Sequence, residues 1–229
     1  MKKKLSKRFK KLLSVSKDEK PLKIEDAIGK VKTNCTAKFD ESIDVSLSLN
    51  LKHKKEEHNL RTVVNLPHGN GKKLKVAVLC EEGKLSEAKK SGADLFDSGA
   101  LINDISAGKI KFDKLVATPA MMSKMGKLGK ILGPKGLMPN PKLGTVTNNI
   151  ESAVKALKSG QIEIKNDKDG NVGVSIGKKS FLDNKIKENF NSLLQGISKE
   201  KPSGIKGDFI QSVFLTSTMG LSYKLKINK

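Results

Sequence analysis

The sequence predicts two domains with α/β and α+β folds. An α+β domain is built from both chain ends, residues 1–67 and 160–229, and a Rossmann-like α/β domain is inserted over residues 68–159. The ends alternate apolar and polar positions, as half-buried antiparallel strands do. The middle alternates short, continuously apolar runs with helical patterns, which is typical of a parallel sheet covered on both faces. The chain should therefore cross twice between the domains.

The N-terminal segment predicts a basic helix. The first 17 residues hold eight basic groups and no acid, and Leu5, Phe9, Leu12 and Leu13 recur on one helical face. Such a helix can contact phosphate, or it can pack on the protein with a solvated outer face, and the pattern fits both. The following expected elements are a helix over 24–33 and strands over 42–51 and 60–66.

The inserted domain should begin with a strand that is buried on both faces, because residues 73–80 read KLKVAVLC. The helix that closes this domain should end at Gly160, a plausible C-terminal glycine. The elements expected after the first strand are a helix over 85–91, a strand over 94–96, a helix over 99–107, a strand over 114–118 and a helix over 149–160.

The C-terminal part returns to alternating strands. Residues 161–177 predict two strands around a turn that contains Asp169 and Gly170. Ser180 should cap a helix that reaches about Ile197, and residues 208–227 should close the chain as a hairpin.

The two chain crossings predict a hinge. The expected hinge residues are Pro67, Gly69, Gly71, Ser159 and Gly160. Gly permits backbone angles that other residues avoid, and domain motion is absorbed at a few such positions.

The charge balance points to a polyanionic partner. The chain carries 45 Lys and Arg against 24 Asp and Glu, a net charge of +21. Only Arg8 and Arg61 are arginines. Lysine suits phosphate as a point charge, whereas arginine reads guanine with two parallel hydrogen bonds, so backbone and shape recognition is favoured. A genome-wide preference for Lys codons would give the same composition, and an anionic membrane surface is the main rival partner.

Enzyme and metal-site motifs are lacking in the sequence. The glycines at 126, 129, 133 and 136 match neither a phosphate-binding loop nor a dinucleotide-binding turn. His53, His58 and His68 show no zinc spacing with Cys35 or Cys80. We therefore expect no catalysis, no metal and no cofactor. Without a signal peptide or a long apolar run, the chain is predicted to be cytoplasmic, although the basic start also suits an organellar transit segment.

Residues 121–142 combine Met, Gly, Pro and Lys in one unusual stretch. From Lys114 to Ile150 there are six lysines and no acid. Gly lets backbone amides approach phosphate, and Pro limits the entropy lost on binding. We interpret the stretch as a rigid cationic loop, fastened by Leu128, Ile131, Leu132, Leu137 and Met138; a solvated basic loop is the alternative. The lysines expected to face the partner are Lys124, Lys127, Lys130, Lys135 and Lys142.

Two shorter segments are candidates for RNA contact. Phe39 lies in the polar segment AKFDES, where it is either an exposed ring for a ribose or base, or a residue at the edge of the core. Thr216–Gly220 is a turn with three hydroxyls and a Met, which can bind ribose and phosphate or can simply close a hairpin.

These motifs together resemble one family. ATPAMMSKMGKLGKILGPKGLMPNPKLGTVT closely resembles the signature of the bacterial-type L-one family of large-subunit ribosomal proteins, the stalk proteins. AKFDESIDV, NLPHGNGK, IEIKNDKDGNVGVSIGKKSF and TSTMG match its other segments in the same order. The likeness spans nearly the whole chain. Departures at Ala120, at Asn70 and over residues 51–60 fall outside the segments that would contact RNA.

The resemblance implies a discontinuous domain that binds large-subunit rRNA and an inserted domain that faces tRNA leaving the ribosome. It implies a monomer when free, ribosomal components as partners, no membrane, and in many members repression of the protein's own mRNA. The rRNA-binding residues implied here are Lys38, Phe39, Asp40, Glu41, Lys165, Asp167, Lys168, Ser217, Thr218, Met219 and Gly220. The alternatives from other classes are a general nucleic-acid chaperone and an α/β nucleotide-binding enzyme.

Overall fold

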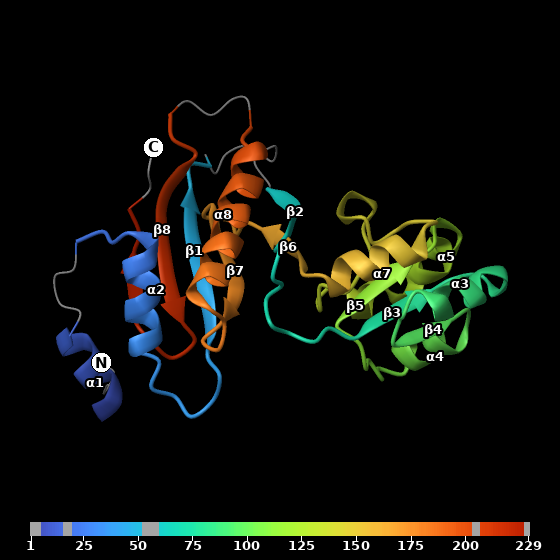
Figure 1. The fold of residues 1–229 in the computed structure, drawn as a ribbon. Helices are drawn as coiled ribbons and strands as arrows, with labels where there is room; N and C mark the ends of the chain where they lie inside the picture. The colour runs from blue at the N-terminus through green and yellow to red at the C-terminus, as the bar shows by residue number, and fades with distance from the viewer. Residues whose placement is uncertain (1–5, 16–19, 52–59, 203–206, 227–229) are drawn as a thin grey trace. The chain divides into compact units, whose positions relative to one another are not determined.

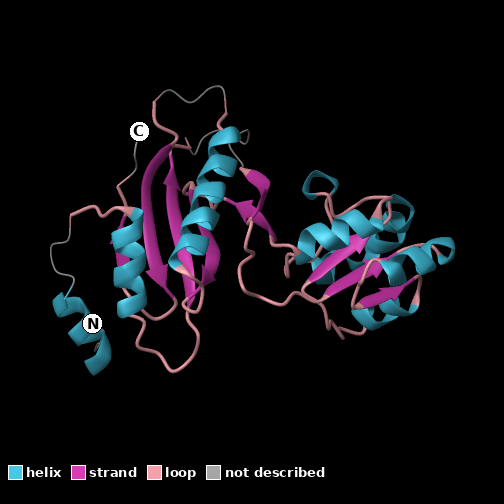
Figure 2. Cartoon of the chain, viewed as in Figure 1, coloured by secondary structure: helices cyan, strands magenta, loops and turns pink. Residues whose placement is uncertain are grey.

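The computed structural model describes residues 6–15, 20–51, 60–202 and 207–226. The chain divides into two compact units, here named unit 1 (residues 1–71 and 163–229) and unit 2 (residues 72–162). Both units mix helices and strands, which confirms the predicted α/β character (Figure 1, Figure 2). The predicted boundaries fall within a few residues of this division, and the independence of the two domains stays a prediction.

Unit 1 is built on a four-stranded antiparallel sheet. Its order is β7-β1-β8-β9, with β1 at Ser42–Leu49, β7 at Asn171–Lys178, β8 at Ile210–Ser217 and β9 at Ser222–Lys224. Strand β1 pairs with β7 on one side and with β8 on the other, so segments from both chain ends lie side by side (Figure 1). The predicted strand over 42–51 and the C-terminal hairpin are confirmed.

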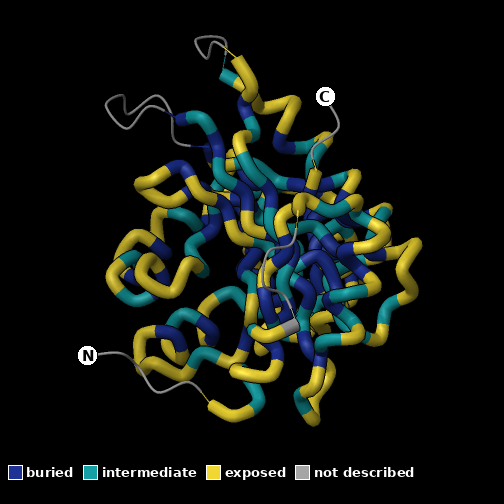
Figure 3. Tube along the Cα trace, turned by 90° about the vertical axis from the view of Figure 1, so that its left-hand side faces the viewer, coloured by how far each residue is buried: buried dark blue, intermediate teal, exposed yellow. Residues whose placement is uncertain are grey.

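Two helices cover one face of this sheet. Helix α2 (Ile24–Thr33) contacts β8 and helix α8 (Asp183–Lys199), and α8 contacts β7. The alternation of β1 turns four apolar side chains into this interface, and α8 adds its own stripe. Figure 3 colours the chain by burial, with the buried positions in dark blue. The buried residues concerned are Ile43, Val45, Leu47, Leu49, Ile186, Phe190, Leu193 and Ile197.

The two strands expected over 161–177 form, but they do not pair with each other. Strand β6 (Gln161–Lys165) pairs with β2 (Arg61–Asn65) in a separate two-stranded sheet, whereas β7 pairs with β1. The prediction of two strands around one turn therefore missed their partners. The turn between them is wound around the Asp167 carboxylate, which accepts hydrogen bonds from the amides of Asp169 at 2.9 Å and Asn171 at 2.7 Å.

The predicted cap at Ser180 is wrong. Helix α8 begins at Asp183, and its N-cap position is Leu182. The Ser180 amide and hydroxyl instead donate to the Asp40 carboxylate at 3.1 and 2.8 Å. A hydrogen bond to a charged carboxylate is stronger than one between neutral groups. Ser180 therefore bonds to Asp40 in the loop and does not cap the helix.

Unit 2 holds a three-stranded parallel sheet in the order β4-β3-β5. Its strands are β3 (Val76–Leu79), β4 (Leu95–Asp97) and β5 (Lys114–Ala117). All four residues of β3 are fully buried, as the continuous apolar run predicts. One face packs on α3 (Leu85–Lys90) and α7 (Ile150–Lys158), and the other on α4 (Ala100–Ser106) and the segment that follows β5.

That following segment is not the loop that the sequence predicts. Its Met/Gly/Lys stretch begins with short helical turns: α5 (Pro119–Met125), η3 (Gly126–Leu128) and α6 (Gly129–Leu132). The reason is that Met121, Met125, Leu128 and Leu132 recur at helical spacing and are all buried. Gly at 126 and 129 ends each short turn without breaking this register. Leu137 and Met138 are partly buried against the same core. The predicted fastening is therefore confirmed for Leu128, Leu132, Leu137 and Met138, and Ile131 is half-buried.

The other helical elements of the described residues are the short 3-10 helices η2 (Glu82–Lys84) and η4 (Pro141–Leu143) in unit 2 and the α-helix α1 (Lys7–Val15) in unit 1. Over the described residues, no helix is long and apolar enough to cross a membrane.

Candidate nucleic-acid interface

Two segments from opposite ends of the chain meet at one end of the unit 1 sheet. The antiparallel pairing of β1 with β8 places the start of β1 beside the end of β8, with Ile43 opposite Ser217. The Thr218 amide then donates to the Ser42 carbonyl at 3.0 Å. We call the resulting surface, residues 36–41 and 217–220, the two-loop surface. It contains eight of the predicted rRNA-binding residues.

Glu41 joins the two segments. Its side chain is fully buried. One carboxylate oxygen accepts from the Ala37 amide at 3.0 Å, while the other accepts from the Ser217 hydroxyl at 2.8 Å and the Met219 amide at 3.0 Å. Glu41 was predicted to contact RNA, but its burial and its three protein donors give it a positioning role in this structure.

The ionised form of Glu41 is favoured by these donors. Burial alone raises the pKa of this carboxyl. The hydrogen bonds from Ala37, Ser217 and Met219, with the nearby positive charge of Arg8, outweigh that effect and leave the pKa below its usual value. The two-loop surface therefore rests on a buried carboxylate.

Apolar side chains project from this support into solvent. Phe39 is 52% exposed and Met219 is 48% exposed, and both belong to the few large apolar residues that are exposed in the described chain. An exposed ring and an exposed thioether on loops that also carry polar atoms can contact ribose and base faces. Of the two interpretations of Phe39, the exposed ring is the one that the structure shows.

The other residues of the two-loop surface divide between contact and support. Ser217 is buried with Glu41, whereas Thr218 is exposed. The Thr218 hydroxyl accepts from the Ser42 amide at 3.0 Å, so it also fixes the turn. Gly220 lies so close to Ser217 that an added Cβ would collide with the Ser217 hydroxyl oxygen. Asp40 accepts a hydrogen bond from the Ser180 hydroxyl, and Lys38 is exposed.

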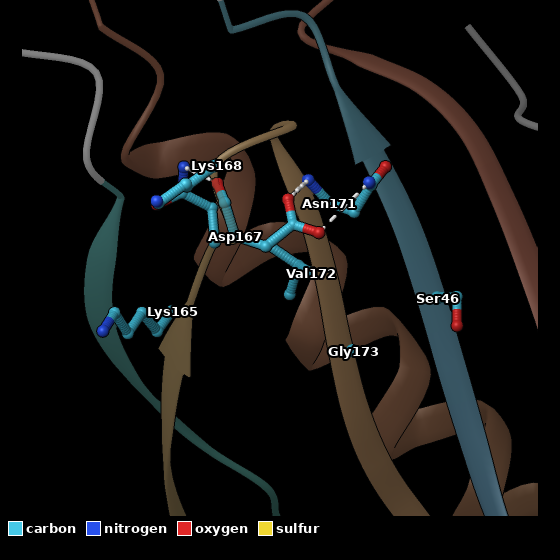
Figure 4. Close-up of a pocket in the computed structure, with 8 residues that line it drawn as sticks. Ser46, Lys165, Asp167, Lys168, Asn171, Val172 and Gly173 are labelled. Atoms are coloured by element: carbon cyan, nitrogen blue, oxygen red, sulfur yellow. Dashed lines mark hydrogen bonds between the residues drawn. The ribbon is translucent and has the colours of Figure 1, made fainter. Parts of the chain in front are cut away.

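The remaining three predicted rRNA-binding residues lie outside the two-loop surface: Lys165, Asp167 and Lys168. The turn that holds them is near the far end of β1, because Asn171 pairs with Ser48 and Gly173 with Ser46. About six residues of β1 separate this turn from Glu41, a distance of roughly 20 Å. Figure 4 shows Asp167 between Asn171 on one side and Lys165 and Lys168 on the other, at the rim of an open hollow of about 760 Å³.

The face of β1 that alternates with its buried stripe runs between these two regions, and on it Ser46 is exposed while Ser42, Asp44 and Ser48 are half-buried. The residues that alternate with its buried stripe are small and polar: Ser42, Asp44, Ser46 and Ser48. Short side chains let a nucleic-acid backbone approach the sheet closely, and the hydroxyls of the three serines can bond to ribose and phosphate. Sequence reasoning missed this surface, although the alternation that predicted the buried face of the strand also indicates the polar one.

The five predicted lysines of unit 2 are all exposed, at positions 124, 127, 130, 135 and 142. The turn after α6 is held by its own hydrogen bonds. The Asn140 amide donates to the Thr145 hydroxyl at 2.8 Å, and the Asn140 side chain accepts from the Lys142 amide at 2.9 Å. These lysines therefore extend from a fixed backbone.

The predicted hinge residues include three glycines with left-handed backbone angles. Gly69, Gly71 and Gly160 have φ values of 64°, 77° and 111°. Within unit 1 the Asn189 side chain donates to the Gly69 carbonyl at 2.8 Å and accepts from the His68 amide at 3.1 Å, so this turn is attached to α8. Motion at the hinge stays a prediction.

Within the described ranges, no group of three or more His, Cys, Asp or Glu side chains could hold a metal ion. His53 and His58 lie outside those ranges. Cys35 and Cys80 are buried free thiols, and burial raises the pKa of both.

Comparison with known proteins defines the class of this chain, which is a structural, non-enzymatic ribosomal protein. The chain belongs to the ribosomal protein L1p/L10e family, whose model matches residues 31–221. It is 57% identical over 225 residues to the large ribosomal subunit protein uL1 of Pelagibacter ubique, and the match covers 98% of each chain. It is 48% identical to the large ribosomal subunit protein uL1 of Prochlorococcus marinus subsp. pastoris, over 99% of this chain and 96% of the relative. The predicted family is confirmed.

Proposed function

We propose that the chain is a structural constituent of the large ribosomal subunit and forms its mobile stalk by binding large-subunit rRNA through the two-loop surface. The observation that carries this proposal is the exposure of Phe39 and Met219 on the two segments that the buried Glu41 joins. An apolar contact patch on a fixed support costs little entropy when RNA binds. Family membership supplies the partner class.

The second RNA-contacting region is the turn that holds Lys165, Asp167 and Lys168. An RNA that reaches from the two-loop surface to this turn would follow the polar face of β1. Binding by both regions would recognise the shape of a structured RNA over roughly 20 Å and not a short sequence. This length is what separates the proposal from charge-driven binding.

Unit 2 supplies the proposed contact with tRNA. Its exposed lysines would bind the phosphates of deacylated tRNA and assist its release from the exit site. The glycines between the units would let unit 2 follow the tRNA while unit 1 stays on rRNA. Repression of translation would follow if the protein's own mRNA presents a similar RNA shape to the two-loop surface. On this proposal the protein is ribosome-bound in the cytoplasm and is a monomer when free.

The test is a salt-dependent titration with two RNAs, the stalk fragment of large-subunit rRNA and an unrelated hairpin of equal length. The variants are Thr218→Ala, Met219→Ala and Phe39→Ala, with Phe96→Ala as the control. Phe96 is also exposed, at 38%, but it lies on β4 of unit 2. We expect the stalk RNA to bind at least about a hundredfold more tightly at high salt, and each two-loop substitution to reduce that margin by about tenfold or more.

Equal binding of both RNAs by the wild type, with the same decline as salt rises, would show a general nucleic-acid chaperone and would overturn the proposal. Loss of affinity in Phe96→Ala equal to that in Phe39→Ala would show that the contact is not at the two-loop surface.

A further inference from the structure

Helix α1 separates its charged and apolar residues onto two faces. Lys7, Lys10 and Lys11 are exposed, and their spacing of three and one places them on one face of the helix. Leu12 is buried and Phe9 is half-buried on the opposite face. The helix contains no acid, so its outer face carries an uncompensated positive charge.

Arg8 fastens this helix to the two-loop surface. One terminal guanidinium nitrogen donates to the Thr36 hydroxyl at 2.9 Å, and the other donates to the Met219 carbonyl at 2.7 Å. These acceptors belong to the two segments that Glu41 joins from within. Arg8 also contributes to the lowered pKa of Glu41. Residues 8 and 219 are thus bonded although 211 positions separate them.

We propose that α1 is a third element of the RNA-binding surface, with Lys7, Lys10 and Lys11 binding phosphates of the same RNA that occupies the two-loop surface. This inference rests on the proposed function. Lysine binds phosphate as a point charge and needs no fixed fork. Because Arg8 fixes the helix, the three lysines extend from a backbone that is already ordered before RNA arrives.

The packing of α1 favours RNA over an anionic membrane. A helix that lies on a bilayer inserts its apolar face into the lipid. In this chain that face is turned toward the protein, where Leu12 is 7% exposed. The outward face offers charge without apolar area, which is what a phosphate backbone requires. A nine-residue helix is about 13 Å long, so the lysines enlarge the surface without reaching beyond unit 1.

Charge-neutral substitutions test this inference. The triple variant Lys7→Gln/Lys10→Gln/Lys11→Gln is compared with a control that removes three exposed lysines elsewhere in unit 1, Lys199→Gln/Lys201→Gln/Lys226→Gln. Lys201 and Lys226 line a hollow with Ile210, at the end of β8 opposite Ser217, roughly 23 Å away. Both variants lose the same net charge. Their thermal unfolding is measured first, and binding of the stalk RNA is then titrated over a range of salt concentrations.

We expect the α1 variant to lower the slope of log K against log salt by about two, since each lost phosphate contact removes about 0.7 to 0.9. The control should change it by less than about one. Equal slopes for the two variants, with tight and selective wild-type binding, would overturn the role of α1 and leave the proposed function intact. A wild type that does not prefer the stalk RNA would instead overturn the proposed function.

Arg8→Lys separates positioning from charge. Lysine keeps the charge but cannot donate in two fixed directions to Thr36 and Met219. We expect affinity for the stalk RNA to fall by about tenfold and the salt slope to become shallower, because the lysines of α1 lose their alignment with the phosphates although the net charge is unchanged. Wild-type affinity in Arg8→Lys would show that the two hydrogen bonds do not position the helix for RNA.

Discussion

The Glu41 carboxylate accepts a hydrogen bond from the Met219 amide at 3.0 Å, across 178 positions of the chain. The same oxygen accepts from the Ser217 hydroxyl, so one buried side chain fixes the turn that exposes Met219. Because the two segments come from opposite chain ends, their common geometry depends on the closed sheet of unit 1. We therefore expect the two-loop surface to form together with the sheet of unit 1.

Glu41→Gln should weaken both stability and RNA binding. In glutamine an NH2 group replaces one of the two carboxylate oxygens. At least one of the three groups that now donate to Glu41 would then face this NH2 group and would be buried without an acceptor. We expect the free energy of unfolding to fall by about 1–3 kcal/mol. Urea unfolding measures this effect, and RNA titration at low temperature measures the loss of affinity in protein that is still folded. An unchanged midpoint and affinity would show that the carboxylate does not support the surface.

The contribution of Glu41 to stability should depend on pH. The pKa of Glu41 is lower in the folded chain than its ordinary value of 4.5, so the ionised carboxylate stabilises the fold above that pH. This contribution is lost as the pH falls through the folded pKa. We expect the stability difference between wild type and Glu41→Gln to shrink as the pH falls below 4.5 and through the lower pKa of the folded chain. A constant difference over this range would contradict the assignment.

Substitutions at Ser217 and Gly220 should have strongly non-additive effects on the free energy of unfolding. An alanine Cβ at position 220 would collide with the Ser217 hydroxyl oxygen, which cannot rotate away without losing Glu41. The Cβ of Ser217 itself would lie at an ordinary 3.5 Å. Gly220→Ala should therefore destabilise by about 1–3 kcal/mol, and Ser217→Ala in the same chain should relieve the collision. In a double-mutant cycle by urea unfolding, the combined loss should be smaller than the sum of the single losses. Additive losses would mean that the turn avoids the collision.

Local patterns predicted the elements well, and distant partners less well. The alternation over 42–51 and the apolar run over 73–80 each depend on a period that is visible in the sequence. The pairing of β6 with β2 depends on which edge is free after folding, and no pattern within residues 161–177 encodes it.

The candidate site shows the same division. Resemblance to the family indicated the segments of the two-loop surface, and the structure adds that Glu41 lies beneath it and Phe39 upon it. The bond from Arg8 to Met219 could not be inferred from spacing, because no periodicity links residues 211 positions apart. The rarity of arginine in the chain was the available signal.

The contact between α8 and β2 gives a prediction about stability alone. A Cβ at Gly196 would collide with the Val64 side chain, whereas a Cβ at Gly29 in α2 would meet none of the described atoms within 4 Å. Gly196→Ala should lower the free energy of unfolding by about 1–3 kcal/mol. Adding Val64→Ala to the same chain should recover part of this loss, because it removes the side-chain atoms that collide. Gly29→Ala, the matched control, should stabilise by about 0.5–1 kcal/mol, since alanine favours a helix. Thermal unfolding of the four proteins decides, and equal effects of the two glycine substitutions would contradict this packing.

Binding of tRNA to unit 2 should depend on where its lysines lie as well as on how many there are. Lys127 and Lys130 extend from η3 and α6, on the sheet face that holds Met125 and Leu132. Lys89 and Lys90 are equally exposed, but they lie at the end of α3, which packs on the other face through Ala88. The pair Lys127→Gln/Lys130→Gln and the pair Lys89→Gln/Lys90→Gln therefore remove the same charge from opposite sides of the unit 2 sheet.

If the cationic segment contacts tRNA, the first pair should lower the slope of log K against log salt by about 1.5 in a titration with deacylated tRNA, and the second should leave it nearly unchanged. The physical reason is that counterions are released only where phosphates meet protein cations, whereas a loss of two charges elsewhere changes the long-range field, which salt screens within about 10 Å. Equal slopes for the two pairs would show that tRNA is attracted by the net charge of unit 2, and the position of the lysines would then have no specific role.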